Sequence, residues 1–196
     1  MLFRSFKSHI DGLVRKLSKY MYILVKLHSS LPRNILKKIF FGIVYPHILY
    51  CLPVFGVASY SATKPVETML KRFIRLISGS RNLLSHTTPM FRELKLLKFK
   101  DLVELQLLKY MHRILNNKTC NFLKNSLQHN QIRRNINLRN NSHIDSPFYT
   151  LTKSRQALLY RGPAIWNRLP NETKAERNAK LFETSIKLNY LNSYNS

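Results

Sequence analysis

A stripe of apolar residues at helical spacing near the start of the chain constrains the fold more than any other feature. The stripe advances in steps of three or four, through Ile10, Val14, Leu17, Met21, Leu24 and Leu27. Such steps place one apolar face on an α-helix. Basic residues occupy the other side of the same stretch, at Arg15, Lys16, Lys19 and Lys26. We therefore predict a helix from about Ile10 that buries one face and presents a basic one.

A second helix is predicted to start at Pro32, because proline fits the first helical position. Its core side would consist of Ile35, Leu36, Ile39, Phe40 and Ile43. Lys37 and Lys38 would face away from that side. Pro46 and Pro53 should kink or end this helix, since proline lacks an N–H and crowds the preceding turn.

The segment from Pro65 to Ile77 predicts a third helix. Its apolar stripe is formed by Val66, Leu70, Phe73 and Ile77. The basic residues on the opposite side are Lys71, Arg72 and Arg75. Gly79 follows at a position where helices favour a left-handed residue, so we expect it to close this helix.

Two more helices are predicted before residue 128. A threonine followed by proline favours a helix start and a short amphipathic segment over 88–97. A longer helix is expected over 101–115, with Asp101 and Glu104 near its positive N-terminal end. Its apolar positions are Leu102, Val103, Leu105, Leu107, Leu108, Met111 and Ile114. They surround most of the helix, which should therefore lie buried at the centre of the domain.

The composition changes at Gln128. The run QHNQIRRNINLRNN is rich in Asn and Arg and has no apolar period, which predicts a linker or a mobile basic loop over 128–147. Beyond it we expect a short extended piece over 148–151, an apolar cluster and a final helix over 174–190. The apolar cluster consists of Leu158, Tyr160, Ile165, Trp166 and Leu169. The fold class is therefore mainly α, a helical bundle with a basic irregular linker and a small C-terminal helical segment.

The charge is strongly positive throughout. Lys and Arg number 33 against 9 Asp and Glu, a formal net charge of +24. Residues 1–100 carry 18 basic and 3 acidic side chains, and residues 101–196 carry 15 and 6. Basic residues on folded elements favour a long phosphate backbone as partner, because each neutralised phosphate releases condensed counterions. We expect binding to weaken steeply with salt.

Residues arranged for catalysis are not found in the sequence. Asp11, Asp101 and Asp145 each stand without an acidic neighbour, whereas nucleotidyl transfer needs paired carboxylates that hold metal ions. No glycine-rich phosphate loop, HExxH motif or nucleophile elbow occurs, and Cys51 and Cys120 show no metal-ligand spacing. We therefore expect no enzyme activity and no cofactor, and single histidines such as His112 are expected to be surface or packing residues.

The basic helix faces and the basic loop are the candidate nucleic-acid contacts. Arg and Lys bind phosphates, and interleaved aromatics can stack on unpaired bases. The residues that we predict to contact nucleic acid are Arg15, Lys16, Lys19, Lys26, Lys37, Lys38, Lys71, Arg72, Arg75, Arg133, Arg134, Arg139 and Arg161. A solvated basic face over an aromatic core is the alternative interpretation. For Phe73 and Trp166 we prefer the core, because each lies in an apolar pattern.

A membrane span is the main rival interpretation. The twenty residues IFFGIVYPHILYCLPVFGVA, over 39–58, are free of charge and long enough to cross a bilayer. Two prolines and a histidine count against insertion, so burial in a domain core is favoured. The first 27 residues lack the continuous apolar stretch of a secretory signal, although they are compatible with a mitochondrial presequence. A nuclear or cytoplasmic location is favoured over a secreted or membrane one.

Four sequence pieces together resemble a known family. They are SHIDGLVRKLSKYMYILVKLHSSLPRNILKKIFFGIVYPHILYCLPVFG, LKRFIRLISGS, HTTPMFRELKLLKFKDLVEL and YRGPAIWNRLP, in this order. Their order and spacing resemble the C-terminal portion of non-LTR retrotransposon reverse transcriptases of the jockey and CR1 kind, over about residues 5–190. The chain departs from the family pattern at Phe55, where tryptophan is usual, and at Leu70, where glutamine is common.

The resemblance implies a domain organisation and partners. Residues 1–79 would form a thumb-like helical region and 80–127 a helical post-polymerase region, followed by the linker 128–147 and a C-terminal segment 148–196 with the GPAIWNRLP motif. In that family the catalytic aspartates, which bind Mg²⁺, and the endonuclease domain lie upstream of this portion. The resemblance therefore implies a truncated, non-catalytic fragment that binds RNA or RNA/DNA hybrid, with the palm and fingers of a parent polymerase as a further partner. A genomic relic with no selected role is an alternative.

Overall fold

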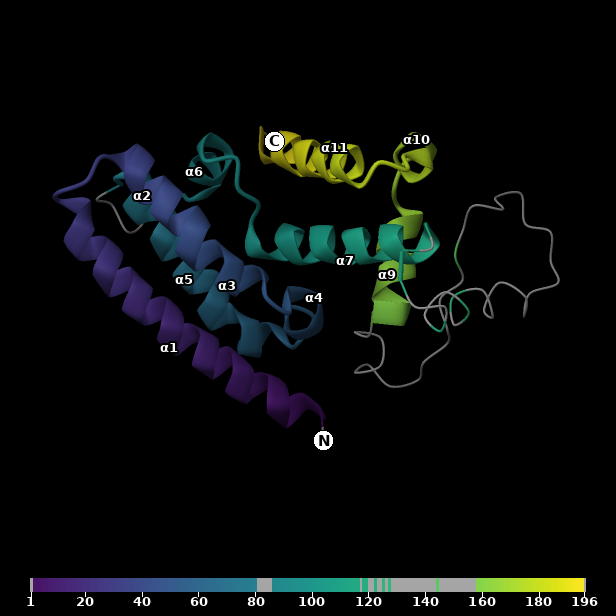
Figure 1. Cartoon of the computed structure of the whole chain (residues 1–196), viewed down its shortest axis with the longest axis horizontal. Coiled ribbons are helices and arrows are strands. Elements are labelled where there is room, and N and C mark those ends of the chain that lie inside the picture. The colour runs from purple at the N-terminus through teal and green to yellow at the C-terminus, as the bar shows by residue number, and fades with distance from the viewer. Residues whose placement is uncertain are drawn as a thin grey trace. The chain divides into compact units, whose positions relative to one another are not determined.

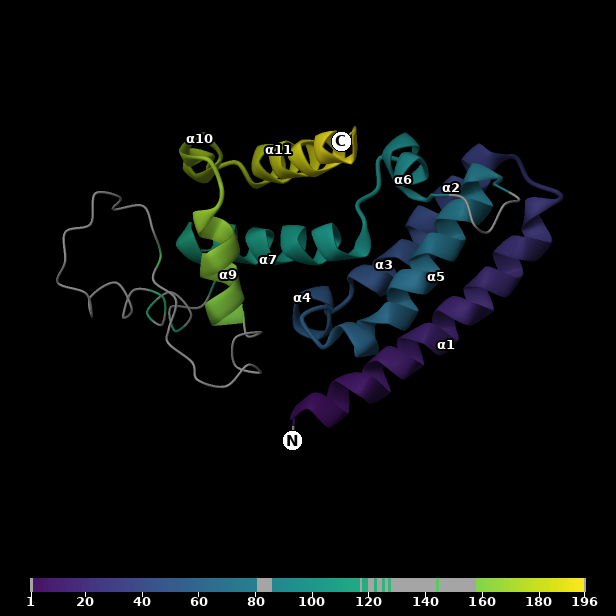
Figure 2. The same cartoon turned by 180° about the vertical axis from the view of Figure 1, so that it is seen from behind.

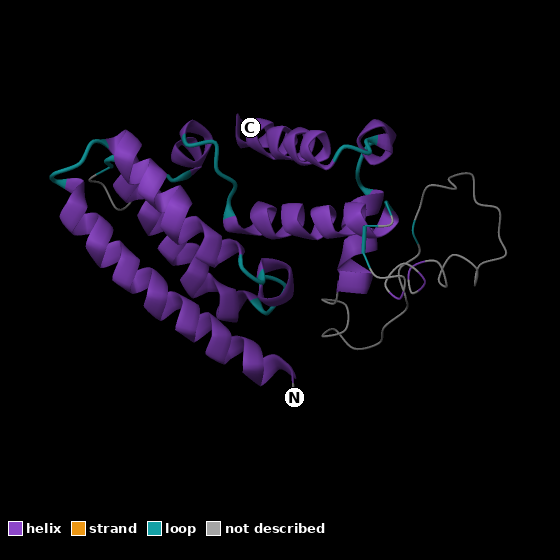
Figure 3. Cartoon of the chain, viewed as in Figure 1, coloured by secondary structure: helices purple, strands orange, loops and turns teal. Residues whose placement is uncertain are grey.

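The computed structural model describes residues 2–80, 86–116, 118, 119, 122, 125, 127, 144 and 158–195, with the side chains of 2–5 and 195 left aside. Across these ranges the regular structure is helical and contains no strand (Figure 3), which confirms the mainly α fold. The chain divides into two compact units. The first unit comprises Met1–Asp101 with Leu191–Ser196, and the second comprises Leu102–Tyr190.

The helices of the first unit are mostly contributed by its first eighty residues (Figure 1). They are α1 (Leu2–His28), α2 (Arg33–Ile39), η1 (Phe40–Val44), α3 (Tyr45–Leu49), α4 (Leu52–Phe55), α5 (Tyr60–Ser78) and α6 (Thr88–Glu93). The short 3₁₀-helix η3 (Ser193–Asn195) belongs to the same unit. The helix α7 (Phe99–Leu115) begins there, and its residues from Leu102 onward belong to the second unit.

The core of the first unit is formed by three long helical stretches. α1 packs against both α5 and α2, and Leu17 of α1 is completely buried. Phe40 and Phe73 are also completely buried, and their ring centroids lie 5.6 Å apart. α1 and α5 run in the same direction and the α2–α3 stretch runs in the opposite one (Figures 1 and 2). The apolar stripe predicted for α1 thus includes residues of this core, although the helix starts earlier than expected.

The second predicted helix passes through a π-helical turn. The run Arg33–Leu49 stays helical across α2, η1 and α3, and the N–H of Tyr45 bonds to the carbonyl of Phe40, five residues back. The extra residue in this turn rotates the following side chains by about 100°. Val44 is consequently buried, and Ile43, which the sequence pattern assigns to the core, is 49% exposed.

The sequence predicts that Pro46 kinks or ends this helix, and of these two effects the end is wrong, because α3 continues through Pro46. Pro46 lies in the first turn of α3, directly after the wider π turn of η1. A residue without an N–H is tolerated in the first turn of a helix. Pro32, similarly, is the residue before α2 and not its first helical residue. The helix ends only at Leu49, because Tyr50 is extended and Cys51 is left-handed with φ 56°.

The segment considered as a membrane span is broken into short pieces. Residues 39–58 pass from the end of α2 through η1 and α3, turn at Cys51, and continue into α4. Phe40, Ile48 and Leu52 are fully buried. No helix among the described residues is long and apolar enough to cross a membrane.

The third predicted helix, α5, begins at Tyr60, five residues before the predicted start, and Pro65 lies inside it. Thr63 and Val66 on either side of the proline are buried against the core. This tertiary packing outweighs the local cost of an internal proline. The predicted apolar stripe of α5 is buried in full, at Val66, Leu70, Phe73 and Ile77.

Gly79 closes α5 as predicted. It is left-handed with φ 68°, its N–H bonds to the carbonyl of Leu76, and the N–H of Ser80 bonds to the carbonyl of Arg75, both at 3.1 Å. This pair of hydrogen bonds is a Schellman motif, which satisfies carbonyls at the helix end. The guanidinium of Arg33 lies against this glycine, so a Cβ built there would be 2.4 Å from its Nη2.

The segment that follows α6 is held by the end of the chain. α6 begins at Thr88 as predicted but ends at Glu93, because the chain turns at Lys95, which is left-handed with φ 53°. The hydroxyl of Tyr194 accepts a hydrogen bond from the N–H of Lys98 at 2.9 Å and donates one to the carboxylate of Asp101. The ammonium of Lys98 lies 4.4 Å from the Tyr194 ring centroid.

The second unit is built around α7, with α9 (Leu158–Asn167), α10 (Asn171–Ala175) and α11 (Ala179–Asn192). All seven apolar residues predicted to be buried on α7 are buried, so the central helix is confirmed. Gly162 of α9 lies against Met111 of α7, where a Cβ would be 2.6 Å from the methionine sulfur. The indole of Trp166 and the ring of Phe182 complete the core beside α7, 5.6 Å apart.

The final helix predicted over 174–190 is divided in two, which is a correction. Glu176 is extended with ψ 117°, and it separates α10 from α11. The side-chain oxygen of Asn178 accepts a hydrogen bond from the N–H of Lys180 at 3.0 Å, which caps α11. The expected linker 128–147, apart from Ile144, and the extended piece 148–151 lie outside the described residues. Ile144 is buried, and its N–H and carbonyl both bond to the amide of Asn167.

Two glycines offer a test of this fold. Gly79→Ala should lower the free energy of unfolding by about 1–2 kcal/mol, because alanine is strained at positive φ and its Cβ meets Arg33. Gly12→Ala should instead raise it by roughly 0.5–1 kcal/mol, since a Cβ there meets nothing within 4 Å in the middle of α1. Urea unfolding followed by circular dichroism measures both, and equal effects would contradict the described α5 terminus.

Candidate nucleic-acid interface

The outward face of α1 carries the largest group of predicted contacts. Arg15, Lys16, Lys19 and Lys26 are all exposed, because the buried stripe occupies the opposite side of the helix. Arg15, Lys19, Tyr22 and Lys26 follow one another at steps of four, three and four, and so form a single line along the helix. This line, which we call the α1 stripe, is about 16 Å long at 1.5 Å per residue.

Within the described part of the chain, no ion pair joins Arg15, Lys19 or Lys26 of the α1 stripe to an acidic side chain. Asp11, the only acidic residue on the helix, is exposed and lies four residues before Arg15. The ammonium of Lys26 lies 4.6 Å from the ring centroid of Tyr22, which is 62% exposed. The stripe therefore presents positive charge and an aromatic ring together.

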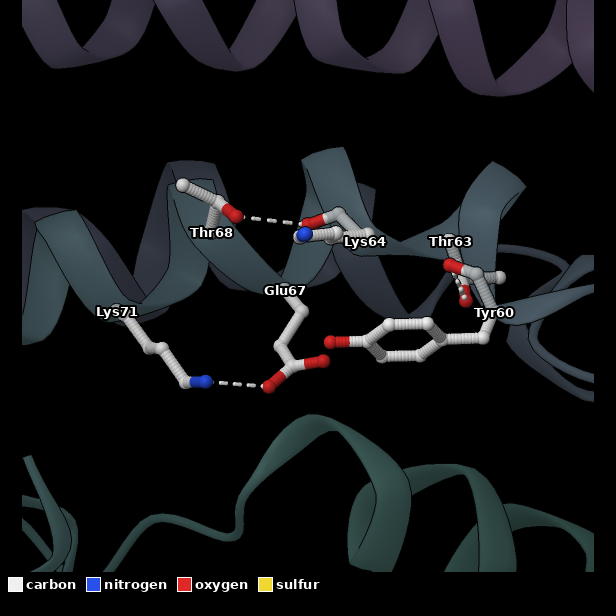
Figure 4. Close-up of polar contacts among 6 residues, drawn as sticks. All are labelled: Tyr60, Thr63, Lys64, Glu67, Thr68 and Lys71. Carbon is white, nitrogen blue, oxygen red and sulfur yellow. Dashed lines mark hydrogen bonds and ion pairs between the residues drawn. The ribbon is translucent and has the colours of Figure 1, made fainter.

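The basic face predicted for α5 is only partly available. Arg72 is exposed, but the ammonium of Lys71 bonds to the carboxylate of Glu67 at 2.5 Å. Tyr60, Glu67 and Lys71 lie along one side of α5 (Figure 4). Lys64 is a further exposed cation that the sequence analysis did not single out, and its ammonium lies 5.9 Å from the Tyr60 ring centroid. The four-residue spacing of Tyr60 and Lys64 was the signal available in the sequence.

A basic depression lies where α1 and α5 end and α2 begins. It has a volume of about 450 Å³, and its basic lining residues are His28, Arg33 and Arg75. Arg75 is partly exposed. Two helix C-termini border the depression, and their carbonyls carry partial negative charge that favours cations. Arg33 against Gly79 is therefore explained by the end of α5 without any ligand.

Lys37 and Lys38 lie in the last turn of α2. Lys38 is exposed and Lys37 is partly exposed. Lys38 thus faces away from the core as predicted, and Lys37 does so in part. Neither lies on the helix that carries the α1 stripe.

Arg161 belongs to an ionic network of the second unit. Its guanidinium lies 3.8 Å from the carboxylate of Glu104, which also accepts a hydrogen bond from the hydroxyl of Tyr190 at 2.9 Å. Lys109 and Glu183 form another ion pair in this unit, at 2.7 Å. Arg133, Arg134 and Arg139 lie outside the described residues, so their predicted role stays a prediction.

Phe73, Trp166 and His112 are core or packing residues and not candidate contacts for a base or a metal ion. Phe73 is fully buried and Trp166 is 4% exposed, which confirms the preference for the core. His112 is also buried, stacks on Phe182 with centroids 4.3 Å apart, and its Nε2 lies 2.8 Å from the carbonyl oxygen of Glu176. Among the described residues, no group of three or more His, Cys, Asp or Glu side chains is placed to hold a metal ion.

Comparison with known proteins identifies no relative: no protein-family model, no curated protein and no solved structure matches the chain significantly. The candidate interface therefore rests on the geometry of the described residues alone. Its best-supported part is the α1 stripe with Lys16, followed by Lys38 and Arg72.

Glu67→Gln tests whether Lys71 is held back by its ion pair. The substitution should let Lys71 reach a phosphate and steepen the dependence of log K on log salt by about 0.9, as expected for one more neutralised phosphate. Binding of a labelled RNA/DNA hybrid at several salt concentrations gives this slope. Glu172→Gln is the control, because it changes the net charge equally from an exposed position on α10. Equal slopes for the two variants would show that Lys71 reaches no phosphate.

Proposed function

We propose that the chain holds RNA or RNA/DNA hybrid through basic helix faces and catalyses no reaction itself. The exposed basic face of α1 is the observation that carries this proposal, because its four cations lack carboxylate partners among the described residues. A set of uncompensated charges on one rigid helix costs self-repulsion in the folded protein. A phosphate backbone relieves that repulsion and releases its own condensed counterions on binding.

The proposed origin of the chain is the thumb and post-polymerase region of a non-LTR retrotransposon reverse transcriptase of the jockey or CR1 kind. The order of the four sequence pieces supports this proposal, and the helical fold is compatible with it. In such an enzyme the palm and fingers would supply the aspartates and Mg²⁺, and they would be the second partner of this fragment. The basic helices would then contribute affinity for the template and primer.

Two other functions have less support. A small membrane protein with one span over 39–58 would have to expose to lipid the side chains of Phe40, Val44 and Ile48, which are buried in the first unit. A genomic relic with no selected role makes no demand on folding. Circular dichroism of the purified chain distinguishes this alternative in part, because an unfolded chain would leave the proposed helix faces without a scaffold.

The proposal is tested by removing charge from the α1 stripe. The triple variant Arg15→Gln, Lys19→Gln and Lys26→Gln should weaken binding to an RNA/DNA hybrid and flatten the salt slope by about 0.9 for each phosphate that is no longer neutralised. Glutamine is a good helix former, so α1 should persist. Fluorescence anisotropy of a labelled hybrid, at salt concentrations from about 50 to about 300 mM, measures both effects, because phosphate contacts weaken steeply over this range.

A matched control removes the same charge elsewhere. Lys118, Arg177 and Lys180 are exposed residues of the second unit, and their substitution by glutamine also removes one arginine and two lysines. This control should reduce the slope much less than the α1 variant. A hybrid affinity that did not change with salt in the unmodified chain would contradict the proposed function. Equal weakening in the two triple variants would show that binding is not localised on α1.

A further inference from the structure

An exposed aromatic ring lies within the α1 stripe. Tyr22 is 62% exposed, and the ammonium of Lys26 lies 4.6 Å from its ring centroid. Ile23 and Val25 are also exposed, at 49% and 53%, but they lie on either side of the helix and not on the line of the stripe. The charge around Tyr22 restricts which partner its ring can take.

Cations flank Tyr22 on the same line of the helix. Lys19 lies just under one turn before Tyr22, and Lys26 lies just over one turn after it. Arg15 extends the line by one more turn, and no acidic residue occurs on α1 after Asp11. A ligand that fits must therefore offer a flat apolar group between negative charges. An unpaired base between two phosphates has this chemistry.

We propose that Tyr22 stacks on an unpaired base and that the α1 stripe thereby binds single-stranded nucleic acid. The proposal rests on the proposed function and specifies its ligand. In a duplex the faces of the bases are covered by their neighbours, so only phosphates and groove edges can reach a convex helix surface. In a single strand a base can lie on the tyrosine ring while the flanking phosphates meet Lys19 and Lys26.

Tyr60 provides a comparison within the same unit. It is 67% exposed and has a lysine four residues later, just as Tyr22 has. However, Glu67 lies on the same side of α5 and holds Lys71 in an ion pair (Figure 4). The surroundings of Tyr60 are therefore less positive, although its ring is just as accessible. Tyr60 should contribute little to binding.

The experiment compares a single-stranded oligouridylate with an RNA/DNA hybrid of the same length, using the full chain. Tyr22→Ala should weaken binding to the single strand by about tenfold, within the range measured for removal of one stacked base. Its affinity for the hybrid should stay within about twofold of the unmodified chain, because phosphate contacts are retained. Tyr22→Phe should bind the single strand normally, since it keeps the ring and lacks only the hydroxyl. Tyr60→Ala should bind both ligands normally.

Several outcomes would overturn the proposal. An unchanged affinity of Tyr22→Ala for the single strand, with helical circular dichroism retained, would show that the ring does not stack. Equal weakening for the single strand and the hybrid would show a role in general binding. Vesicles containing phosphatidylserine form a further arm of the experiment. If Tyr22→Ala lost binding to these vesicles but kept binding to oligouridylate, Tyr22 would belong to a membrane-binding surface. If the unmodified chain bound neither nucleic acid at low salt, the proposed function itself would fail.

Discussion

Burial of one face of α1 against α5 and α2 is the interaction on which the first unit depends. Leu17, Phe40 and Phe73 are fully buried there, and burial of such side chains contributes roughly 1.5–3 kcal/mol each. Charged side chains cannot enter this core without a large desolvation cost. The same packing that stabilises the three helices therefore forces Arg15, Lys19 and Lys26 onto one outward line. Stability and positive charge are two consequences of one pattern.

The two units use their charged residues differently. Residues 1–101 carry 18 basic and 4 acidic side chains, and 102–190 carry 15 and 5, so the excess is positive in both. In the second unit, however, Glu104 and Glu183 are engaged with Arg161 and Lys109 across helices. In the first unit the one ion pair given by the described residues, between Glu67 and Lys71, lies within a single helix. The exposed cations of α1 lie along one helix and form no ion pair within the described part of the chain, which is why the proposed ligand is placed there.

Much of the helical framework could be predicted because apolar spacing is a local property. The existence of α1, α5 and α7 follows from it, although α1 and α5 begin earlier than predicted. The start of α6 follows from the Thr88–Pro89 pair, and the closure of α5 follows from the left-handed preference of glycine at Gly79. The π turn at Phe40–Val44 could not be predicted, since its single extra residue is compatible with the same apolar pattern. It moved Ile43 out of the core and allowed the helix to pass Pro46. The division between α10 and α11 was also not predicted. Asn178 caps α11, but an asparagine alone is a weak sequence signal for a helix start, and the extended backbone at Glu176 is visible only in the structure.

The fold class, the buried faces of the main helices and the sign of the charge follow from the amino-acid sequence alone. These properties depend on the spacing and number of residues, which folding does not change. Which cations remain available, in contrast, depends on the packed structure. Glu67 and Lys71 lie four residues apart on one helix, so their ion pair is a local property. Arg161 belongs to a basic segment as much as Arg15 does, but packing brings Glu104 within reach of Arg161, whereas Arg15 forms no ion pair among the described residues. Electrostatic partners are set by distance in space, and for a contact such as that between Arg161 and Glu104 the distance arises only when the helices pack.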